Sequence, residues 1–163
     1  MHLWDGWMVL ILAAHLDVFI MKKQITTAII LAAGAGYRLR PLTNKTPKCL
    51  MPVGGLPILH HQLSALKKNG IKNISIVVGF MADDVCQYAQ INFPGLRFDF
   101  VLNPVFDHTN TLYSLALAAH ALKKSGSALL LNGDVVFDPA IIGLLEKTDG
   151  DKSYAAIITG PCA

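Results

Sequence analysis

Short apolar runs alternate along this chain with segments whose apolar residues recur at helical spacing. A short apolar run is typical of a buried strand, whereas a repeat every three or four residues is typical of a helix with one buried face. The runs predict strands over residues 27–31, 74–78, 98–102, 127–131 and 154–158. The repeats predict helices over residues 56–69, 82–90, 111–124 and 139–147.

Strands that alternate with helices in this way form a mainly parallel sheet with helices on both faces. We therefore predict an α/β fold of the Rossmann-like, three-layer kind. Sheets of this kind bind ligands beyond the carboxyl ends of their strands. The segments that follow predicted strands, and that we expect to line a site, are residues 32–48, 79–83, 103–110 and 132–134.

Residues 1–20 are predicted to be an extension that precedes the domain. Met21 opens a segment that resembles an ordinary protein start leading into the first predicted strand, so we expect the domain to cover residues 21–163. The apolar run at 7–14 is too short to span a bilayer. No lysine or arginine precedes it, unlike in a signal peptide. Anchoring at a membrane surface is the alternative role for this extension, without stable insertion.

The composition is that of a folded domain with a sizeable core. Of the 163 residues, 53% are hydrophobic and 15% are charged, which excludes a disordered chain. The formal net charge of +3 is too small for the basic stripe of a nucleic-acid-binding protein. Cys49, Cys86 and Cys162 lie far apart without a CxxC pair, which favours reduced thiols in the cytoplasm over a disulfide framework or a zinc site.

The segment LAAGAGYRLRPLTNKTPKCLMPV, residues 31–53, follows the first predicted strand and is the main candidate for a binding loop. Gly34 and Gly36 allow a tight turn and a close approach of the backbone to a ligand. Amide groups in such a turn form an anion-binding concavity. Four basic residues that could neutralise a polyphosphate follow in the same segment: Arg38, Arg40, Lys45 and Lys48. A plain turn followed by a solvated loop is the alternative, but it does not explain the prolines that stiffen the segment.

Two common phosphate-binding motifs do not match this segment. The pattern GxxxxGK[ST] is absent. The dinucleotide fingerprint GxGxxG is only half present, because Gly34-Ala35-Gly36 is followed by Tyr37-Arg38-Leu39 and lacks the third glycine. A dinucleotide-dependent oxidoreductase is therefore disfavoured.

The stretch AIILAAGAGYRLRPLTNKTPKCLMPVGGLPIL, residues 28–59, closely resembles the signature LAAGxGxRLxPLTxxxPKxLxPVxGxPIL of nucleotidyltransferases that act on sugar 1-phosphates and phosphocholine. The stretch NPVFDHTNTLYSLALA, residues 103–118, is more similar to the branch that includes CTP:phosphocholine cytidylyltransferases. The resemblance covers residues 22–158. It implies transfer of a nucleoside monophosphate, with CMP favoured, from a triphosphate to phosphocholine or a sugar 1-phosphate, with release of pyrophosphate.

The same resemblance implies roles for particular residues. Arg38 would hold the β- and γ-phosphates and the leaving pyrophosphate, Lys48 would neutralise the α-phosphate, and Asp134 would bind Mg²⁺. The remaining residues of the implied nucleotide-binding set are Leu31, Ala32, Ala33, Gly34, Gly36, Gly79, Asn110, Ser114 and Gly133. Asn110 has a second interpretation, since it could simply cap the helix predicted to begin at residue 111.

Several polar residues near these segments are expected to have structural or minor roles. We expect Asp138 to cap the helix after it, and His60 and His61 to be structural. Asp107 and His108 lie in a ligand-side loop and could shape an acceptor pocket.

Members of the resembled family usually continue well beyond this length, so we expect this chain to be the nucleotide-binding half of such an enzyme. Three hypotheses follow: an active nucleotidyltransferase, a nucleotide-binding fragment that does not catalyse, and a dinucleotide-dependent oxidoreductase. In the fragment, we expect the last predicted strand to expose a sheet edge that favours self-association.

Overall fold

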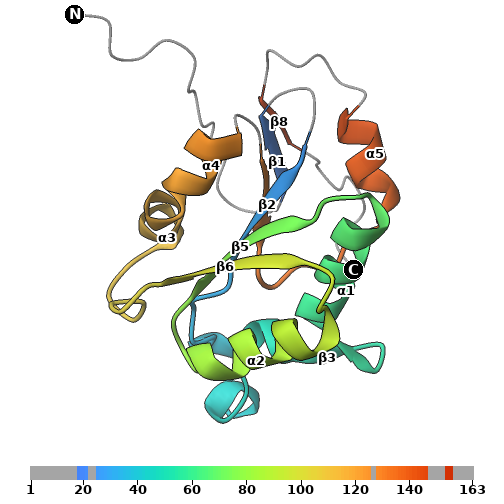
Figure 1. Ribbon diagram of the computed structural model, residues 1–163. Coiled ribbons are helices and arrows are strands. Elements are labelled where there is room, and N and C mark those ends of the chain that lie inside the picture. Colours follow the sequence, from blue (N-terminus) through green and yellow to red (C-terminus); the bar gives the residue numbers. More distant parts are fainter. Residues whose placement is uncertain (1–17, 22–24, 126–127, 147–152, 156–163) are drawn as a thin grey trace, which may run out of the picture.

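The computed structural model describes residues 18–21, 25–125, 128–146 and 153–155. A six-stranded sheet forms its centre, in the order β6-β5-β2-β7-β1-β8 (Figure 1). β2 pairs in parallel with β5 and β7, and β5 pairs in parallel with β6, whereas β1 is antiparallel to β7 and β8. The prediction of a mainly parallel α/β sheet is therefore confirmed. The strands are β1 (Val18–Met21), β2 (Thr27–Leu31), β5 (Asn73–Val78), β6 (Arg97–Leu102), β7 (Leu129–Asn132) and β8 (Ser153–Ala155).

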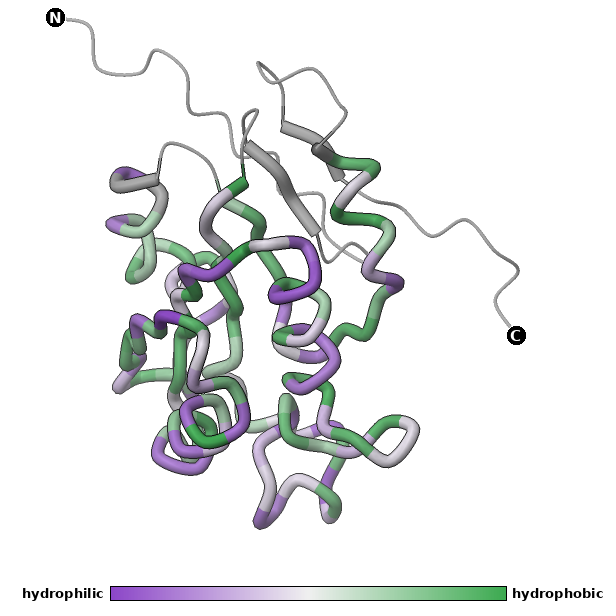
Figure 2. Tube along the Cα trace, turned by 45° about the vertical axis from the view of Figure 1, so that its right-hand side comes forward, coloured by the Kyte–Doolittle hydropathy of each residue, from purple (hydrophilic) through white to green (hydrophobic). Residues whose placement is uncertain are grey.

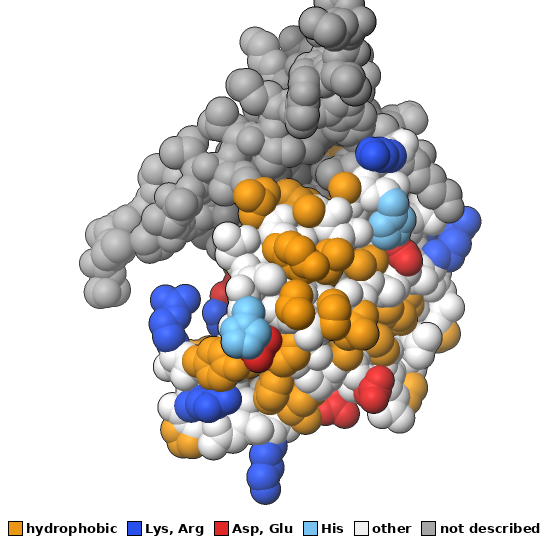
Figure 3. All heavy atoms as spheres, turned by 90° about the vertical axis from the view of Figure 1, so that its left-hand side faces the viewer, with side chains coloured by type: hydrophobic (Ala, Val, Ile, Leu, Met, Phe, Trp, Pro, Cys, Tyr) orange, Lys and Arg blue, Asp and Glu red, His pale blue; other side chains and the backbone are white. Residues whose placement is uncertain are grey.

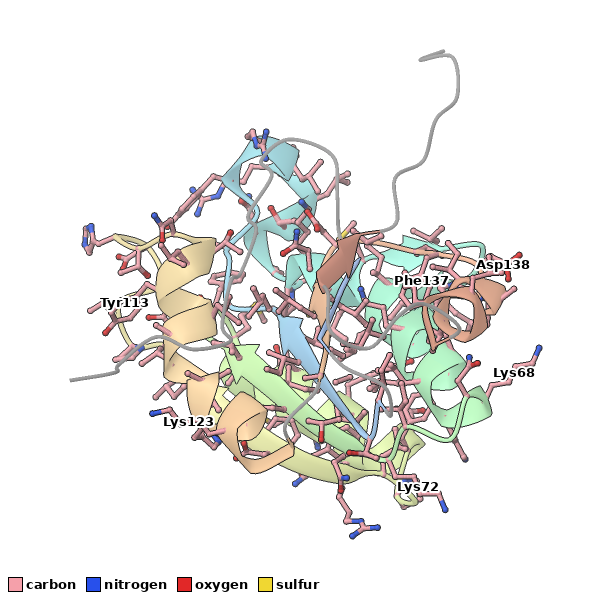
Figure 4. The ribbon with its side chains drawn as sticks, turned by 90° about the horizontal axis from the view of Figure 1, so that it is seen from above. Lys68, Lys72, Tyr113, Lys123, Phe137 and Asp138 are labelled. Carbon is pink, nitrogen blue, oxygen red and sulfur yellow. The ribbon has the colours of Figure 1, made fainter. Side chains whose placement is uncertain are left out.

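Helices cover both faces of the sheet, which makes three layers. Figure 4, seen from above, has α3 with Tyr113 on one side, and α1 and α5 with Lys68 and Asp138 on the other. Side chains alternate between these two cores along β2: Ala28 and Ile30 belong to the larger core, and Ile29 to the smaller one. The helices are α1 (Ile58–Lys68), α2 (Ala82–Asn92), α3 (Thr111–Leu117), α4 (Ala119–Ser125) and α5 (Ala140–Glu146).

The central strands are buried on both faces and the helices on only one. β5 is buried at every position from Ile74 to Val78, as expected of a strand in the middle of a parallel sheet. The helices that surround the sheet alternate between hydrophobic and hydrophilic positions (Figure 2). In the described part of the chain no helix is long and apolar enough to cross a membrane.

The chain between β2 and α1 contains short elements only. Three 3-10 turns, η1 (Tyr37–Leu39), η2 (Leu42–Asn44) and η3 (Lys48–Leu50), lead to a small antiparallel hairpin of β3 (Pro52–Val53) and β4 (Leu56–Pro57). Buried Thr43 donates its hydroxyl hydrogen to the carbonyl of Gly36 at 2.8 Å and ties the second turn to the start of the first. This segment is therefore folded against itself, and is not a loose solvated loop.

Besides shifted ends of other elements and the hairpin of β3 and β4, which was not predicted, three differences from the predicted elements concern the extension, one helix and the last strand. Val18–Met21 is a strand paired with β7 and β8, so the sheet begins three residues inside the extension that we placed at residues 1–20. The helix predicted over 111–124 is broken at Ala118, which separates α3 from α4. The strand predicted over 154–158 is observed at Ser153–Ala155; its positions 156–158, like residues 1–17 of the extension, lie outside the described residues.

Candidate active site

A cleft of about 700 Å³ opens at the carboxyl ends of β2 and β7. Its position agrees with the rule that parallel sheets bind ligands at this edge. It is bounded by the loop after β2, the turn η3, the segment before α3 and the segment after β7. The predicted site residues that line it are Leu31, Ala32, Ala33, Gly34, Gly36, Arg38, Lys48, Asn110, Ser114, Gly133 and Asp134. The structure therefore brings together three regions that are far apart in the sequence: residues 31–49, 106–114 and 132–134.

The loop after β2 leaves the sheet at Ala33. The amide of Ala32 still donates to the carbonyl of Val77 at 2.8 Å, as a strand residue would. The carbonyl of Ala33 accepts from Phe80 N at 3.0 Å, and that of Gly36 accepts from Leu39 N at 2.9 Å. Both carbonyl oxygens thus accept hydrogen bonds from backbone amides of the protein. Oxygens held in this way are less able to repel an anion in the cleft.

Gly36 is required by its conformation and by its neighbours. Its φ of 63° lies in the left-handed region, which side chains rarely adopt. A Cβ there would lie 3.1 Å from the Thr43 side chain and 3.2 Å from Lys48 Cβ. The absence of a side chain at Gly36 therefore lets Lys48 pack against the loop beside the cleft.

Lys48 and Asp134 form an ion pair across the cleft, from Nζ to Oδ2. Lys48 comes from η3 and Asp134 follows β7, so this contact joins opposite walls of the site. Both side chains keep about a third of their surface exposed, 28% and 36% respectively. The pair is consequently accessible to solvent and to a ligand.

The four basic residues of the binding loop do not share one role. Arg38 and Lys48 line the cleft, whereas Arg40 and Lys45 are not among its described lining residues. The guanidinium of Arg40 lies over the Tyr37 ring instead, 4.4 Å from its centroid. Of the four residues suggested to neutralise a polyphosphate, Arg38 and Lys48 are therefore the two that the structure places at the cleft.

Gly133 places Asp134 close to the binding loop. Its amide donates to the carbonyl of Leu31 at 2.8 Å. A Cβ at Gly133 would lie 2.8 Å from that oxygen and 2.9 Å from Ala32 Cα. Only a glycine allows the two strand ends to approach so closely, and this approach sets Asp134 opposite Lys48.

The segment before α3 supplies the third wall. Asn110 caps the helix, because its side-chain oxygen accepts from Tyr113 N at 3.2 Å, so the interpretation of Asn110 as a helix cap is confirmed. Ser114 is buried, and its hydroxyl accepts from the Asn103 side-chain amide at 3.2 Å. Both residues line the cleft while serving these structural roles.

Gly79, which belongs to the expected nucleotide-binding set, is not among the described residues that line the cleft, and its binding role stays a prediction. The structure shows that it also allows close packing. A Cβ there would lie 2.7 Å from the Ala33 carbonyl oxygen and 2.8 Å from Phe106 Cβ. Gly79 thus lets the end of β5 approach both the binding loop and the segment before α3.

The residues expected to be structural have structural contacts. His60 Nδ1 lies 2.9 Å from the Tyr88 hydroxyl, and His61 Nε2 lies 2.8 Å from the Val53 carbonyl oxygen. Asp138 accepts from Ala140 N at 2.9 Å at the start of α5. Burial raises the pKa of the Cys49 thiol to about 12, so this cysteine remains protonated and is a poor nucleophile.

Sequence reasoning missed several residues of the cleft. Tyr37, Cys49, Phe106, Thr109 and Asn132 line it as well. All of these except Cys49 lie in segments already expected to line a site, so their position after a strand was the available signal. Asp107 lines the cleft as suggested, whereas His108 is not among the described lining residues.

One flank of the molecule, beside the segment before α3, is apolar at its surface. Hydrophobic side chains gather on the face that lies at the left of Figure 1 (Figure 3). The elements on that side carry four exposed large hydrophobic residues: Leu102, Val105, Leu112 and Tyr113. An exposed apolar surface therefore adjoins the third wall of the cleft.

Comparison with known proteins agrees with this geometry. CMP-5'-(3-aminopropyl)phosphonate synthase of Streptomyces rubellomurinus is 38% identical over 129 residues, which are 79% of this chain and 20% of that protein. Choline-phosphate cytidylyltransferase of Streptococcus pneumoniae is 41% identical over 98 residues, which are 60% of this chain and 41% of that protein. The chain thus spans less than half the length of these curated relatives.

Solved structures of related proteins have a fold similar to that of this chain. The CTP:phosphocholine cytidylyltransferase from Streptococcus pneumoniae superposes with a TM-score of 0.52 at 41% identity, over 60% of this chain and 42% of that one. The inositol-1-phosphate CTP transferase from T. maritima superposes with a TM-score of 0.64 at 25% identity, over 79% of this chain and 51% of that one.

The family profile described as nucleotidyl transferase matches residues 27–162. That range includes every segment that lines the cleft. The chain belongs to the nucleotidyl transferase family.

Proposed function

We propose that this chain forms the nucleotide-binding part of an enzyme that transfers a nucleoside monophosphate, most favourably CMP from CTP, to a phosphorylated small molecule and releases pyrophosphate. The observation that carries this proposal is the meeting of the glycine loop, Arg38, Lys48 and Asp134 in one cleft. These are the groups that a triphosphate and its metal ion require. Family membership removes the oxidoreductase hypothesis.

The chemistry of the transfer suits this set of residues. An oxygen of the acceptor phosphate attacks the α-phosphorus in line, the bond from the α-phosphorus to the bridging oxygen breaks, and pyrophosphate leaves. Catalysis of such a step rests on positioning and on stabilising the developing negative charge. In this proposal Lys48 binds the α-phosphate, and Arg38 binds the leaving pyrophosphate.

Asp134, the carboxylate of the cleft that lies opposite Lys48, suits Mg²⁺. Mg²⁺ is commonly bound through one or two carboxylates together with substrate phosphates and water. Among the described residues no group of three or more His, Cys, Asp or Glu side chains is gathered as a self-sufficient metal site. Asp134 would hold the ion against the triphosphate, and the ion would neutralise phosphate charge. Its present partner, the Lys48 ammonium, would then be released toward the α-phosphate.

Two observations support CTP and a phosphorylated amino compound as the pair of substrates. The names of the relatives reported above contain CMP, cytidylyl or CTP, and two of the acceptors that they name carry an amine or a quaternary ammonium group. In this chain Asp107 lines the cleft beside Phe106 and remains exposed. A carboxylate beside an aromatic ring suits a cationic group. A sugar 1-phosphate is the alternative acceptor.

A second candidate function is triphosphate binding without turnover. It is favoured by the ion pair at the cleft, where Asp134 is the carboxylate placed opposite Lys48.

One screen tests these candidates. The chain is incubated with Mg²⁺ and each of four nucleoside triphosphates, against phosphocholine, an aminoalkylphosphonate, a sugar 1-phosphate and no acceptor, and pyrophosphate release is recorded together with triphosphate affinity. Release that requires CTP and an amino acceptor supports the proposal, and loss of that release in Asp134→Asn assigns it to this cleft. Affinity without release supports the second candidate. No affinity for any triphosphate would refute both.

A further inference from the structure

Gln62 is a fully buried polar residue on the apolar face of α1. Its exposed fraction is 0%, and Leu59, Leu63 and Leu66 on the same helix are also fully buried. Its side-chain Nε2 donates to the carbonyl of Asn132 at 2.7 Å and to that of Val135 at 2.8 Å. Both hydrogens of the amide are therefore used on a single short segment.

The two carbonyls that Gln62 binds lie on either side of Gly133 and Asp134. Gln62 thus fixes the backbone immediately before and immediately after this dipeptide. The amide of Gly133 is bound to the carbonyl of Leu31 at 2.8 Å. The segment that carries Asp134 is consequently held to α1 at two points and to β2 at a third.

Burying the glutamine side chain has an unfavourable free energy, which its two hydrogen bonds must offset. Gln62 Oε1 is buried and has no hydrogen-bond partner among the described residues, which is unfavourable for an acceptor removed from water. Rotating the amide would set Oε1 against two carbonyl oxygens, so the observed orientation is the favourable one. An apolar residue of similar length would fill the core without the unsatisfied oxygen. We therefore attribute the presence of glutamine at residue 62 to the two hydrogen bonds that its amide donates.

We propose that Gln62 is a positioning residue, which holds the backbone of Asn132–Val135 so that the Asp134 carboxylate faces the cleft and receives a divalent cation together with a triphosphate. This inference rests on the proposed function. It concerns a residue outside the cleft that acts through Asp134. Groups that orient a metal ligand typically contribute a factor of about 10–100 to metal affinity.

Gln62→Met removes both donors and keeps the length of the side chain. Asn69→Ala is the matched control, because the Asn69 amide also links the end of α1 to a later segment, donating to the Pro139 carbonyl at 3.1 Å, away from the cleft. Gln62→Asn is a milder variant, which keeps the amide but is one methylene too short to reach both carbonyls. Unfolding temperature is recorded for all variants.

The measured quantity is the gain in CTP affinity on adding Mn²⁺, which separates a metal effect from general damage to the fold. We expect this gain to fall by about 10–100-fold in Gln62→Met and by less in Gln62→Asn. Affinity for metal-free CTP should change little, and Asn69→Ala should keep the full gain at a comparable loss of stability. A full gain in both Gln62 variants overturns the positioning role and leaves the proposed function intact. Absence of any gain in the unmodified chain overturns both.

Discussion

At the scale of single residues, the ion pair between Lys48 and Asp134 makes a prediction that depends on the ligand. Lys48→Met should weaken CTP binding in the presence of Mn²⁺ by about 1.5–3 kcal/mol, the value of a hydrogen bond to a charged group. The same change should strengthen binding of Mn²⁺ alone, because it removes the cation that now occupies the Asp134 carboxylate. Calorimetric titration with Mn²⁺, with and without CTP, measures both effects.

Lys45→Met is the control for this change. It removes the same charge from the same segment, but Lys45 is not among the described residues that line the cleft. Affinities that change equally in the two variants would mean that only net charge matters, and would contradict the specific role of Lys48.

The buried thiol of Cys49 predicts a dependence of stability on pH. Its pKa is raised from 9.0 to about 12 by burial, so the folded state keeps the proton when the unfolded state begins to lose it. The contribution of this thiol to stability is complete below pH 9 and is lost as pH rises from 9 toward 12. Between these values the free energy of unfolding should fall faster than in Cys49→Ala, by up to about 1.4 kcal/mol per pH unit.

Chemical denaturation at several pH values compares the two proteins. The slopes are compared, since Cys49→Ala also changes packing in the core. Parallel curves above pH 9 would show that the thiol ionises in the folded protein as readily as in the unfolded one.

The sequence predicted the positions of some individual residues of the site but not the contacts of others. The motif and the position after a strand selected Arg38, Lys48 and Asp134, and the structure shows that all three line the cleft. The sequence did not indicate that Arg40 stacks on Tyr37 or that Gly79 allows close packing, since only the three-dimensional contacts reveal this. Gln62 was missed, although a signal existed: a polar residue interrupts the buried stripe formed by Leu59, Leu63 and Leu66.

At the scale of secondary-structure elements, hydrophobic periodicity located every predicted helix and strand that lies within the described residues, with shifted ends. Periodicity could not predict the break at Ala118, because the apolar pattern continues through it. Ala118 is fully buried and its amide donates to the carbonyls of Ser114 and Leu115. The bond to Leu115 has the shorter spacing of a 3-10 turn. Helix α3 therefore ends at Leu117, and α4 begins at Ala119.

The close packing at the end of β5 gives a prediction at the same scale. Gly79→Ala should lower the free energy of unfolding by about 1–3 kcal/mol, the usual effect of overpacking, because the new methyl group meets the Ala33 carbonyl oxygen and Phe106. Gly95→Ala is the control, since a Cβ there has no neighbour within 4 Å, and its effect should remain within about 0.5 kcal/mol. Urea denaturation measures both. Equal effects would mean that the contact at Gly79 relaxes freely.

At the scale of the whole molecule, alternation of strands and helices predicted the parallel part of the sheet and the edge at which the cleft lies. It did not predict β1, because Val18–Met21 is antiparallel and falls in a segment that we placed outside the domain. In the described part of the chain β6 and β8 form the two edges of the sheet. Self-association through a sheet edge stays a prediction.

The position of β1 between β7 and β8 predicts that the residues before Met21 contribute to folding. A chain that begins at Met21 loses the backbone pairs of Val18, Phe19 and Ile20 with β7, and β8 loses its pairing with Phe19 and Ile20. The exposed backbone groups of β7 must then be satisfied by water or by another chain. We expect a lower unfolding temperature and a concentration-dependent increase in apparent mass by light scattering. A second chain that begins at Asp17 isolates residues 17–20, because the two lengths differ in these positions alone. If both chains unfold at the same temperature, β1 does not stabilise the sheet, and the domain begins at Met21 as the sequence first indicated.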